Sequence, residues 1–222
     1  MKTLKKLIEG YREFRDEYLS PGNASARERI ATAQSPKVMV IACSDSRVNP
    51  AILTRAGLGD IFTVNNVANI VPPYKEGMGT HHSTSAAIEF AVLHLGVQHI
   101  IILGHSGCGG ISALMAGNTR KREGEYSFIE PWMEIVAKAK TRTLELLPHA
   151  SAQEQATCCE KEALTVSLAN LETFPWVKES IVAGRLQIHA WYFDIGSGDI
   201  LVHEPDEEGF HLLQQLEDGA FS

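Results

Sequence analysis

Three residues with metal-binding side chains follow two short apolar runs of the sequence. Cys43 comes directly after the run at 37–42, and His105 and Cys108 follow the run at 99–103. Two thiolates and an imidazole form the soft nitrogen and sulfur ligand set that suits Zn²⁺. Three protein ligands leave a fourth position open, which is typical of catalytic rather than structural zinc.

A carboxylate and a guanidinium follow the first cysteine in the same loop. Asp45 and Arg47 lie two and four residues after Cys43. Asp45 could accept the proton of a zinc-bound hydroxide and so direct its lone pair at a substrate. Arg47 could hold Asp45 ionised and away from the metal through a bidentate pair. If Arg47 released it, Asp45 would become a fourth ligand and close the site.

Each of these two segments alone is weaker evidence for a metal site than the two together. A Cys-x-Asp-x-Arg sequence is commonly a loop with a surface ion pair, and a His-x-x-Cys flanked by glycines is commonly a turn. The glycines beside Cys108 would nevertheless let the backbone turn so that His105 and Cys108 face one point. A helix predicted from Cys108 onward would favour a thiolate there. A structural zinc site or a redox sensor stays open as the non-enzymatic alternative.

Three short apolar runs predict the strands that position these side chains. They cover residues 37–42, 61–64 and 99–103 and are mostly aliphatic, as buried parallel strands are. Residues 83–95 carry apolar side chains at helical spacing, so this part predicts a strand–helix–strand unit. Active sites of open parallel sheets form at the carboxyl ends of strands. Cys43 should therefore meet the His105–Cys108 segment there.

The second half of the chain predicts helices and then two strands. Residues 128–183 are helical in pattern, and strands at 186–193 and 200–202 flank a hairpin-type turn at 196–199. A last helix is predicted at 208–217. The fold class is α/β, with a mostly parallel central sheet flanked by helices, an N-terminal helical arm and a C-terminal edge strand. We expect a single domain, 1–222, made of an arm at 1–34 and an α/β core at 35–222.

The arm has its own apolar pattern. One face of its first predicted helix carries Leu4, Leu7, Ile8, Tyr11, Phe14 and Tyr18. Asn23 or Ser25 could cap a second short helix that runs to about Gln34. The pattern alone does not decide whether the arm packs on its own domain or on a partner subunit.

Composition excludes several classes of protein. The chain has 222 residues and a formal net charge of −7, which argues against nucleic-acid binding. Neither a secretory signal nor a membrane-spanning run is recognisable, so we expect a cytoplasmic protein with no membrane partner. Burial is the simplest explanation of Cys158 and Cys159, and His81 with His82 could bind metal adventitiously or shuttle protons.

At this point the chain resembles the β-class carbonic anhydrases. The resemblance rests on the segments 43–47 (CSDSR) and 105–110 (HSGCGG), and extends through 66–69 (NVAN), 86–92 (AAIEFAV) and 159–163 (CEKEA). It implies zinc held by Cys43, His105 and Cys108, and an aspartate–arginine dyad at Asp45 and Arg47. The implied reaction is the reversible hydration of CO₂ to bicarbonate and a proton. Hydrolysis of carbonyl sulfide or carbon disulfide on the same zinc is the alternative.

The finer pattern is similar to the plant-like branch of that family. The substrate-binding residues that this implies are Gln34, Phe62, Val67, Phe90 and Gly109. Phe90 stands where the branch has a tyrosine, and Asn65 stands where it has an arginine. Val40 replaces the tryptophan of the members with a regulatory bicarbonate site, so we expect the open dyad form. The resemblance also implies a homodimer, with tetramers or higher assemblies open, in which the arm embraces the partner and Gln34 and Phe62 reach the partner's metal.

Overall fold

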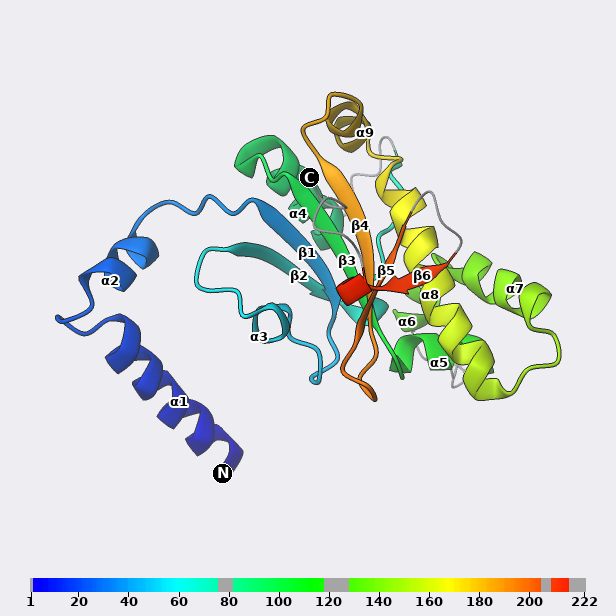
Figure 1. Ribbon diagram of the computed structural model, residues 1–222, viewed down its shortest axis with the longest axis horizontal. Coiled ribbons are helices and arrows are strands. Elements are labelled where there is room, and N and C mark those ends of the chain that lie inside the picture. The colour runs from blue at the N-terminus through cyan, green and yellow to red at the C-terminus, as the bar shows by residue number, and fades with distance from the viewer. Residues whose placement is uncertain (1, 76–81, 118–127, 205–208, 216–222) are drawn as a thin grey trace.

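A six-stranded sheet forms the centre of the molecule (Figure 1). The structure is a computed structural model that describes residues 2–75, 82–117, 128–204 and 209–215. Its strands are β1 (Val38–Cys43), β2 (Ile61–Asn66), β3 (His99–His105), β4 (Gln187–Phe193), β5 (Ile200–His203) and β6 (Phe210–Leu212). They are ordered β2-β1-β3-β4-β5-β6, and the first four are parallel while β5 and β6 are antiparallel. The predicted fold class is therefore confirmed.

The register of the parallel strands determines which residues share the functional edge. Cys43 at the end of β1 pairs with Asn66 at the end of β2, and Leu103 pairs with Ala42. β1 and β3 are buried along almost their whole length, because strands lie on both sides of each and helices cover the sheet. The ends of β1 and β3 therefore meet at one edge of the sheet.

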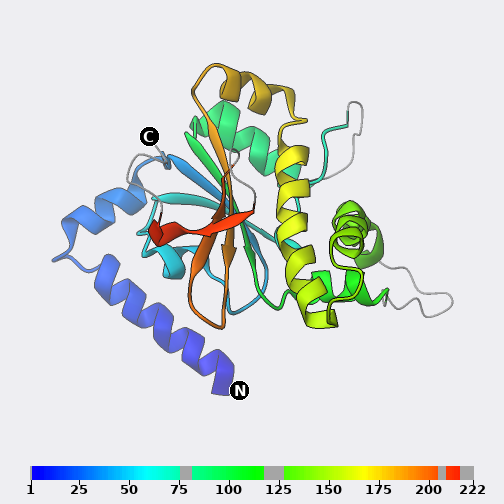
Figure 2. The ribbon, with the colours of Figure 1, turned by 45° about the vertical axis from the view of Figure 1, so that its right-hand side comes forward.

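The helices pack against the sheet in two main apolar clusters. The core helices are α3 (Pro50–Thr54), α4 (Ser83–Glu89), α5 (Gly109–Ala116), α6 (Ile129–Glu134), α7 (Ala137–Leu146), α8 (Ala152–Leu171) and α9 (Pro175–Val182). Apolar residues of α4, α8 and α9 pack with β1, β3 and β4 on one face of the sheet (Figure 2). A second cluster, at the edge that carries Cys43 and Cys108, contains side chains of α5, α6, α7 and α8.

Helix α8 lies very close to the end of β3. A Cβ atom at Gly104 would lie 3.0 Å from a methyl carbon of Leu164, so the absence of a side chain at Gly104 is what permits this approach. Ser151 begins α8 with a reciprocal capping box to Glu154. The result is a long, well-anchored helix beside the strand that ends at His105.

The N-terminal arm extends away from the sheet (Figures 1 and 2). It consists of α1 (Lys2–Tyr18) and α2 (Ala24–Ala31), and the Asn23 side chain accepts a hydrogen bond from the Ala26 amide to cap α2, as predicted. The apolar face of α1 is exposed, with Leu7 67% accessible. The fold of one chain therefore leaves this face without a packing partner among the described residues.

Three details differ from the sequence prediction. The helix predicted at 208–217 is wrong: where residues of this range are described, they form β6 and a short 3₁₀ turn, Leu213–Gln215. β6 pairs with β5, and the Phe210 ring packs at 5.4 Å from His203, so tertiary pairing outweighed local helical pattern. The predicted helix 83–95 changes from α4 to a π-helix at Phe90–Leu95, and α3 was not predicted.

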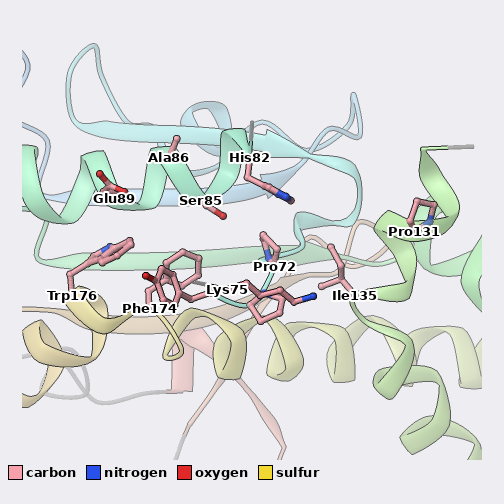
Figure 3. Close-up of a pocket in the computed structure, with 12 residues that line it drawn as sticks. Pro72, Lys75, His82, Ser85, Ala86, Glu89, Pro131, Ile135, Phe174 and Trp176 are labelled. Carbon is pink, nitrogen blue, oxygen red and sulfur yellow. The ribbon is translucent and has the colours of Figure 1, made fainter. Parts of the chain in front are cut away.

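A largely apolar cavity lies beside α4 (Figure 3). It has a volume of about 500 Å³, and Tyr74, Phe174 and Trp176 line it as an aromatic cluster with ring centroids 5.5 to 5.7 Å apart. None of the predicted zinc ligands lines this cavity. The candidate chemistry therefore lies elsewhere, at the edge of the sheet formed by the ends of β1 and β3.

Candidate metal centre

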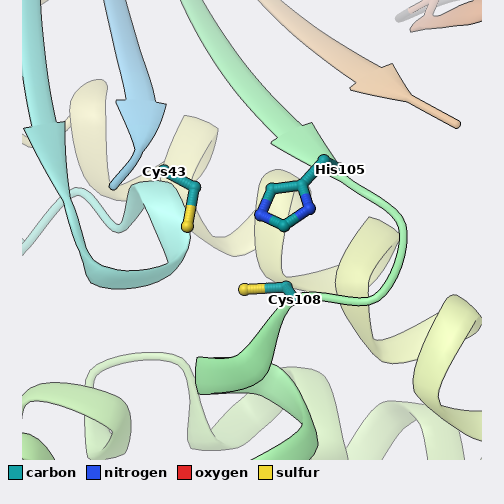
Figure 4. Close-up of side chains that lie close together, drawn as sticks. All are labelled: Cys43, His105 and Cys108. Carbon is teal, nitrogen blue, oxygen red and sulfur yellow. The ribbon is translucent and has the colours of Figure 1, made fainter. Parts of the chain in front are cut away.

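The three predicted zinc ligands converge at the carboxyl ends of β1 and β3 (Figure 4). Cys43 ends β1, His105 ends β3 and Cys108 precedes the first residue of α5. Their ligand atoms all lie within 4.8 Å of one another, and all three residues are buried. Ligand atoms bound to one tetrahedral Zn²⁺ are separated by roughly 3.5–4 Å. A small contraction of this group would therefore complete a zinc site.

The hydrogen bonding of His105 fits a metal ligand. Its Nδ1 lies 3.0 Å from the Ser106 carbonyl oxygen, and this contact requires the proton to be on Nδ1. The Nε2 atom is buried and has no hydrogen-bond partner among the described residues. An orphaned imidazole nitrogen between two thiols is the arrangement that a soft divalent cation would satisfy. The residues present thus fit Zn²⁺.

The two thiols shift each other's pKa in opposite directions. The Cys108 thiol donates a hydrogen bond to the Cys43 sulfur, which lowers the pKa of Cys43 to about 4 and raises the pKa of Cys108. The backbone amides of Asp45 and Ala68 also hydrogen-bond to the Cys43 sulfur and lower its pKa further. The surroundings of Cys43 therefore favour its thiolate form.

Asp45 and Arg47 form the predicted ion pair beside this group. The Arg47 Nε and Nη2 atoms donate to Asp45 Oδ1 and Oδ2 at 2.9 and 2.7 Å, and the Arg47 amide adds a third bond of 2.9 Å. These bonds hold the pKa of Asp45 below its usual range. Arg47 also donates to the Gly107 carbonyl at 3.2 Å, and Gly107 adopts a positive φ of 69° in the turn before Cys108. Asp45 Oδ2 lies 3.9 Å from His105 Nε2.

One buried carboxylate that no sequence motif singled out for a role reaches this centre. Glu160, on α8, is only 4% exposed, and its two oxygens accept hydrogen bonds from the Cys108 amide at 2.9 Å and from the Tyr192 hydroxyl at 2.8 Å. Burial raises its pKa, and the two hydrogen bonds oppose that rise. The only sequence signal was its place in the 159–163 segment that carries the family resemblance. Glu160 thus holds the backbone of a predicted zinc ligand from a distant helix.

Glu160→Ala is expected to weaken both the fold and the metal site. The variant leaves the Cys108 amide and the Tyr192 hydroxyl unsatisfied and opens a cavity, which together lower the free energy of unfolding by about 3–5 kcal/mol. Because the ligand loop loses its anchor, the zinc dissociation constant should rise roughly 10- to 100-fold. Chemical unfolding and competition with a chromogenic chelator measure the two effects. Glu160→Gln, which keeps an acceptor for Cys108, is the control, and unchanged zinc affinity in Glu160→Ala would count against the anchor.

The predicted substrate-binding residues fall into two groups. Val67 directly follows Asn66, the register partner of Cys43, and Gly109 follows Cys108, so both lie at the metal edge. Phe62 and Phe90 contact each other, with ring centroids 6.0 Å apart. Phe62 lies near the start of β2, about four strand residues or roughly 13 Å from that edge.

Gln34 lies still farther from the metal of its own chain. It precedes the start of β1, whereas Cys43 ends that strand, six residues long. Within one chain, therefore, Gln34, Phe62 and Phe90 are not brought to the metal-binding cysteines.

Asn65 makes a hydrogen bond at the metal edge of the sheet. The Asn65 side-chain amide donates to the Cys43 carbonyl at 3.1 Å, so this residue ties the end of β2 to the end of β1.

Cys159 is buried, as predicted, while Cys158 is half-buried beside it on α8. His81, considered as a proton shuttle, lies outside the described residues. Among the described helices none is both long and apolar enough to span a bilayer.

Comparisons with known sequences agree on one family. The family profile described as carbonic anhydrase matches residues 38–200. The chain is 36% identical over 206 residues to beta carbonic anhydrase 3 of Arabidopsis thaliana, which covers 93% of this chain and 79% of the relative. It is 42% identical over 167 residues to the mitochondrial beta carbonic anhydrase 6 of the same plant, covering 75% of this chain but only 56% of that relative. Since relatives include an organellar protein, the cytoplasmic location stays a prediction.

Solved structures show the same fold. The β-carbonic anhydrase CcaA superimposes with a TM-score of 0.86 at 28% identity, covering 96% of this chain and 92% of that one. A structure of the tetrameric β-carbonic anhydrases of Sordaria macrospora gives a TM-score of 0.78 at 28% identity, covering 91% and 97% of the two chains. Fold, sequence and a zinc-compatible Cys–His–Cys group point the same way, and we conclude that this chain belongs to the β-class carbonic anhydrases, a family of zinc lyases.

Proposed function

We propose that this chain catalyses the reversible hydration of CO₂ to bicarbonate and a proton, with Zn²⁺ held by Cys43, His105 and Cys108. The observation that carries the proposal is the placement of the Asp45 carboxylate 3.9 Å from His105 Nε2, beside a buried group that has three ligands among the described residues. Three ligands leave a coordination position for water, and the nearby carboxylate supplies a hydrogen-bond acceptor.

The Asp45–Arg47 dyad orients the oxygen that attacks CO₂. Bound Zn²⁺ supplies a Lewis acid that lowers the pKa of a water molecule. Arg47 holds Asp45 by three hydrogen bonds, which keeps the carboxylate ionised and prevents it from turning toward the metal ligands. Asp45 Oδ2 would then accept a hydrogen bond from the attacking oxygen and so direct the lone pair of that oxygen toward CO₂. This is the open dyad form, as the presence of Val40 also suggests.

The substrate wall combines two subunits. Val67 and Gly109 border the site within the chain, and Val67 offers an apolar surface to a neutral linear substrate. Gln34, Phe62 and Phe90 come from the partner, which explains why one chain leaves them far from its own Cys43. Gln34 would donate a hydrogen bond to a substrate oxygen.

Stopped-flow measurement of CO₂ hydration tests the proposal. Zinc-loaded protein is expected to be active between pH 7 and 9 and to lose that activity on chelation before it unfolds. A structural zinc site would instead unfold as the metal leaves. Absence of hydration by zinc-loaded protein throughout this pH range would overturn the proposal.

The arm supports assembly as a homodimer at least. Leu4, Leu7 and Tyr11 of α1 are 65%, 67% and 59% exposed and form one continuous apolar face. A contiguous exposed apolar face is typical of a contact with another protein chain. Tetrameric relatives are known by structure, which favours assembly of this chain as well. We therefore assign the arm at 1–34 to contact with the partner subunit and leave higher assemblies open.

Leu7→Glu is expected to convert the protein to smaller species and to lower CO₂ hydration. The charge would be buried at the subunit contact, and dissociation would remove Gln34 and Phe62 from the partner's site. Light scattering coupled to gel filtration measures the assembly, and stopped-flow measures activity. Lys6→Gln, at the residue before Leu7, makes the same change in net charge and should preserve both the assembly and the activity. An unchanged oligomer in Leu7→Glu would show that α1 does not form the contact.

A further inference from the structure

The turn after β2 has an unusual backbone. Residues Val67–Asn69 form a short 3₁₀ turn in which Ala68 has a φ of 62° and Asn69 a φ of 47°. The left-handed conformation costs a non-glycine residue roughly 1–2 kcal/mol. Two such residues in succession therefore require neighbouring groups to hold them in place.

This turn contacts the metal centre in two ways. The Ala68 amide hydrogen-bonds to the Cys43 sulfur. A Cβ atom at Gly110 would lie 3.0 Å from the Val67 Cγ1 atom and 3.1 Å from the Ala68 Cβ atom, so the start of α5 packs directly on the turn. The conformation of the turn therefore sets both a hydrogen bond to a zinc ligand and the position of the Val67 side chain.

Two side chains hold the turn by hydrogen bonds. Asn66 spans it, accepting from the Ile70 amide at 2.8 Å and donating to the Ile70 carbonyl at 2.9 Å. Trp132, on α6, donates its indole Nε1–H to the Val67 carbonyl at 2.8 Å. Asn66 belongs to the strand that leads into the turn, whereas Trp132 reaches it from a helix 65 residues away in sequence.

The other two tryptophans of the chain do not use their indole N–H in this way. The Nε1 atoms of Trp176 and Trp191 are buried and have no hydrogen-bond partner within the described part of the chain. Trp176 belongs to the aromatic cluster of the cavity beside α4 (Figure 3). A tryptophan can thus pack in this protein without a partner for its N–H, and the contact of Trp132 with Val67 is a distinct feature.

We propose that Trp132 is a positioning residue for CO₂ hydration, because its indole N–H fixes the Val67–Asn69 turn and so sets the substrate wall and the amide that contacts the Cys43 sulfur. This inference rests on the proposed function. Phenylalanine at position 132 keeps an apolar ring and removes only the donor. The turn then relaxes from its left-handed conformation, and the Ala68 amide withdraws from Cys43.

Trp132→Phe and Trp176→Phe form a matched pair that tests the inference. In zinc-loaded protein, Trp132→Phe should lower kcat/KM for CO₂ hydration roughly three- to tenfold, the effect of one hydrogen bond, while Trp176→Phe should leave it unchanged. In cobalt-substituted protein, the thiolate-to-metal absorption band should shift in Trp132→Phe alone, because a hydrogen bond to the ligand sulfur is lost.

The spectrum separates this inference from the proposed function. If wild-type protein hydrates no CO₂, the proposed function fails, and a band shift specific to Trp132→Phe still supports the role of Trp132 at the metal centre. If both variants give the wild-type spectrum, or if both shift it equally, Trp132 has no positioning role. Wild-type kcat/KM in Trp132→Phe, with active wild-type enzyme, likewise overturns the inference.

Discussion

Cys43→Ala is expected to abolish zinc binding and to reduce CO₂ hydration at least about a thousandfold, because the reaction depends on a metal that activates water. Cys43 contributes one of three ligand atoms that lie within 4.8 Å of one another, and the variant keeps only His105 and Cys108. It also removes the acceptor of the Cys108 thiol and of the Ala68 amide. Metal analysis after gel filtration and stopped-flow hydration measure the two losses.

Cys158→Ala is the matched control for this prediction. Cys158 is a free, half-buried cysteine on α8 that does not belong to the metal-binding group. The same substitution there should leave zinc content and hydration at the level of the wild type. A Cys43→Ala protein that retained both its zinc and its activity would refute the ligand assignment.

Asp45→Asn is expected to keep the zinc and to lower turnover by about a hundredfold or more, the range that general acid–base groups contribute. Asparagine replaces one carboxylate oxygen by an NH₂ group, so one of the two bonds that Arg47 Nε and Nη2 donate, at 2.9 and 2.7 Å, loses its acceptor. The side chain also loses the negative charge that strengthens the hydrogen bond it accepts from the attacking oxygen. Zinc content and kcat, measured on the same preparation, separate this effect from loss of metal.

Asp60→Asn provides the comparison for Asp45→Asn. Asp60 precedes β2 in another loop, where its carboxylate accepts a hydrogen bond from the Gly57 amide. This variant should retain wild-type turnover even where its stability falls slightly. Unchanged turnover in zinc-loaded Asp45→Asn would exclude the role that we give to the dyad.

The metal-binding residues could be predicted from the sequence because they are marked by local sequence patterns. Short apolar runs predicted β1 and β3, and each run ends at residues with metal-binding side chains. Parallel strands place their carboxyl ends at one edge, so Cys43 had to approach His105 once the strand prediction was correct. Glycine at position 107 indicated the turn that brings His105 and Cys108 together, and the structure has a positive φ there.

Contacts between segments far apart in the chain could not be predicted from the sequence. Glu160 holds the Cys108 amide across 52 residues, and Trp132 holds the Val67 carbonyl across 65. The spacing of apolar residues along the sequence does not predict such contacts, because they depend on how α6 and α8 pack against the sheet. The edge strand β6 was mistaken for a helix for the same reason, since pairing with β5 decides its conformation.

By itself, the sequence predicted the Cys–His–Cys group, the Asp45–Arg47 ion pair and the parallel strands that present them, because each depends on side-chain type and short-range spacing. Only the tertiary structure decided how tightly the three ligands converge, which distant side chains anchor them, and that Gln34, Phe62 and Phe90 lie away from the metal of their own chain. Those features follow from strand register and from the close packing of α8 on β3 at Gly104, which are properties of the assembled sheet.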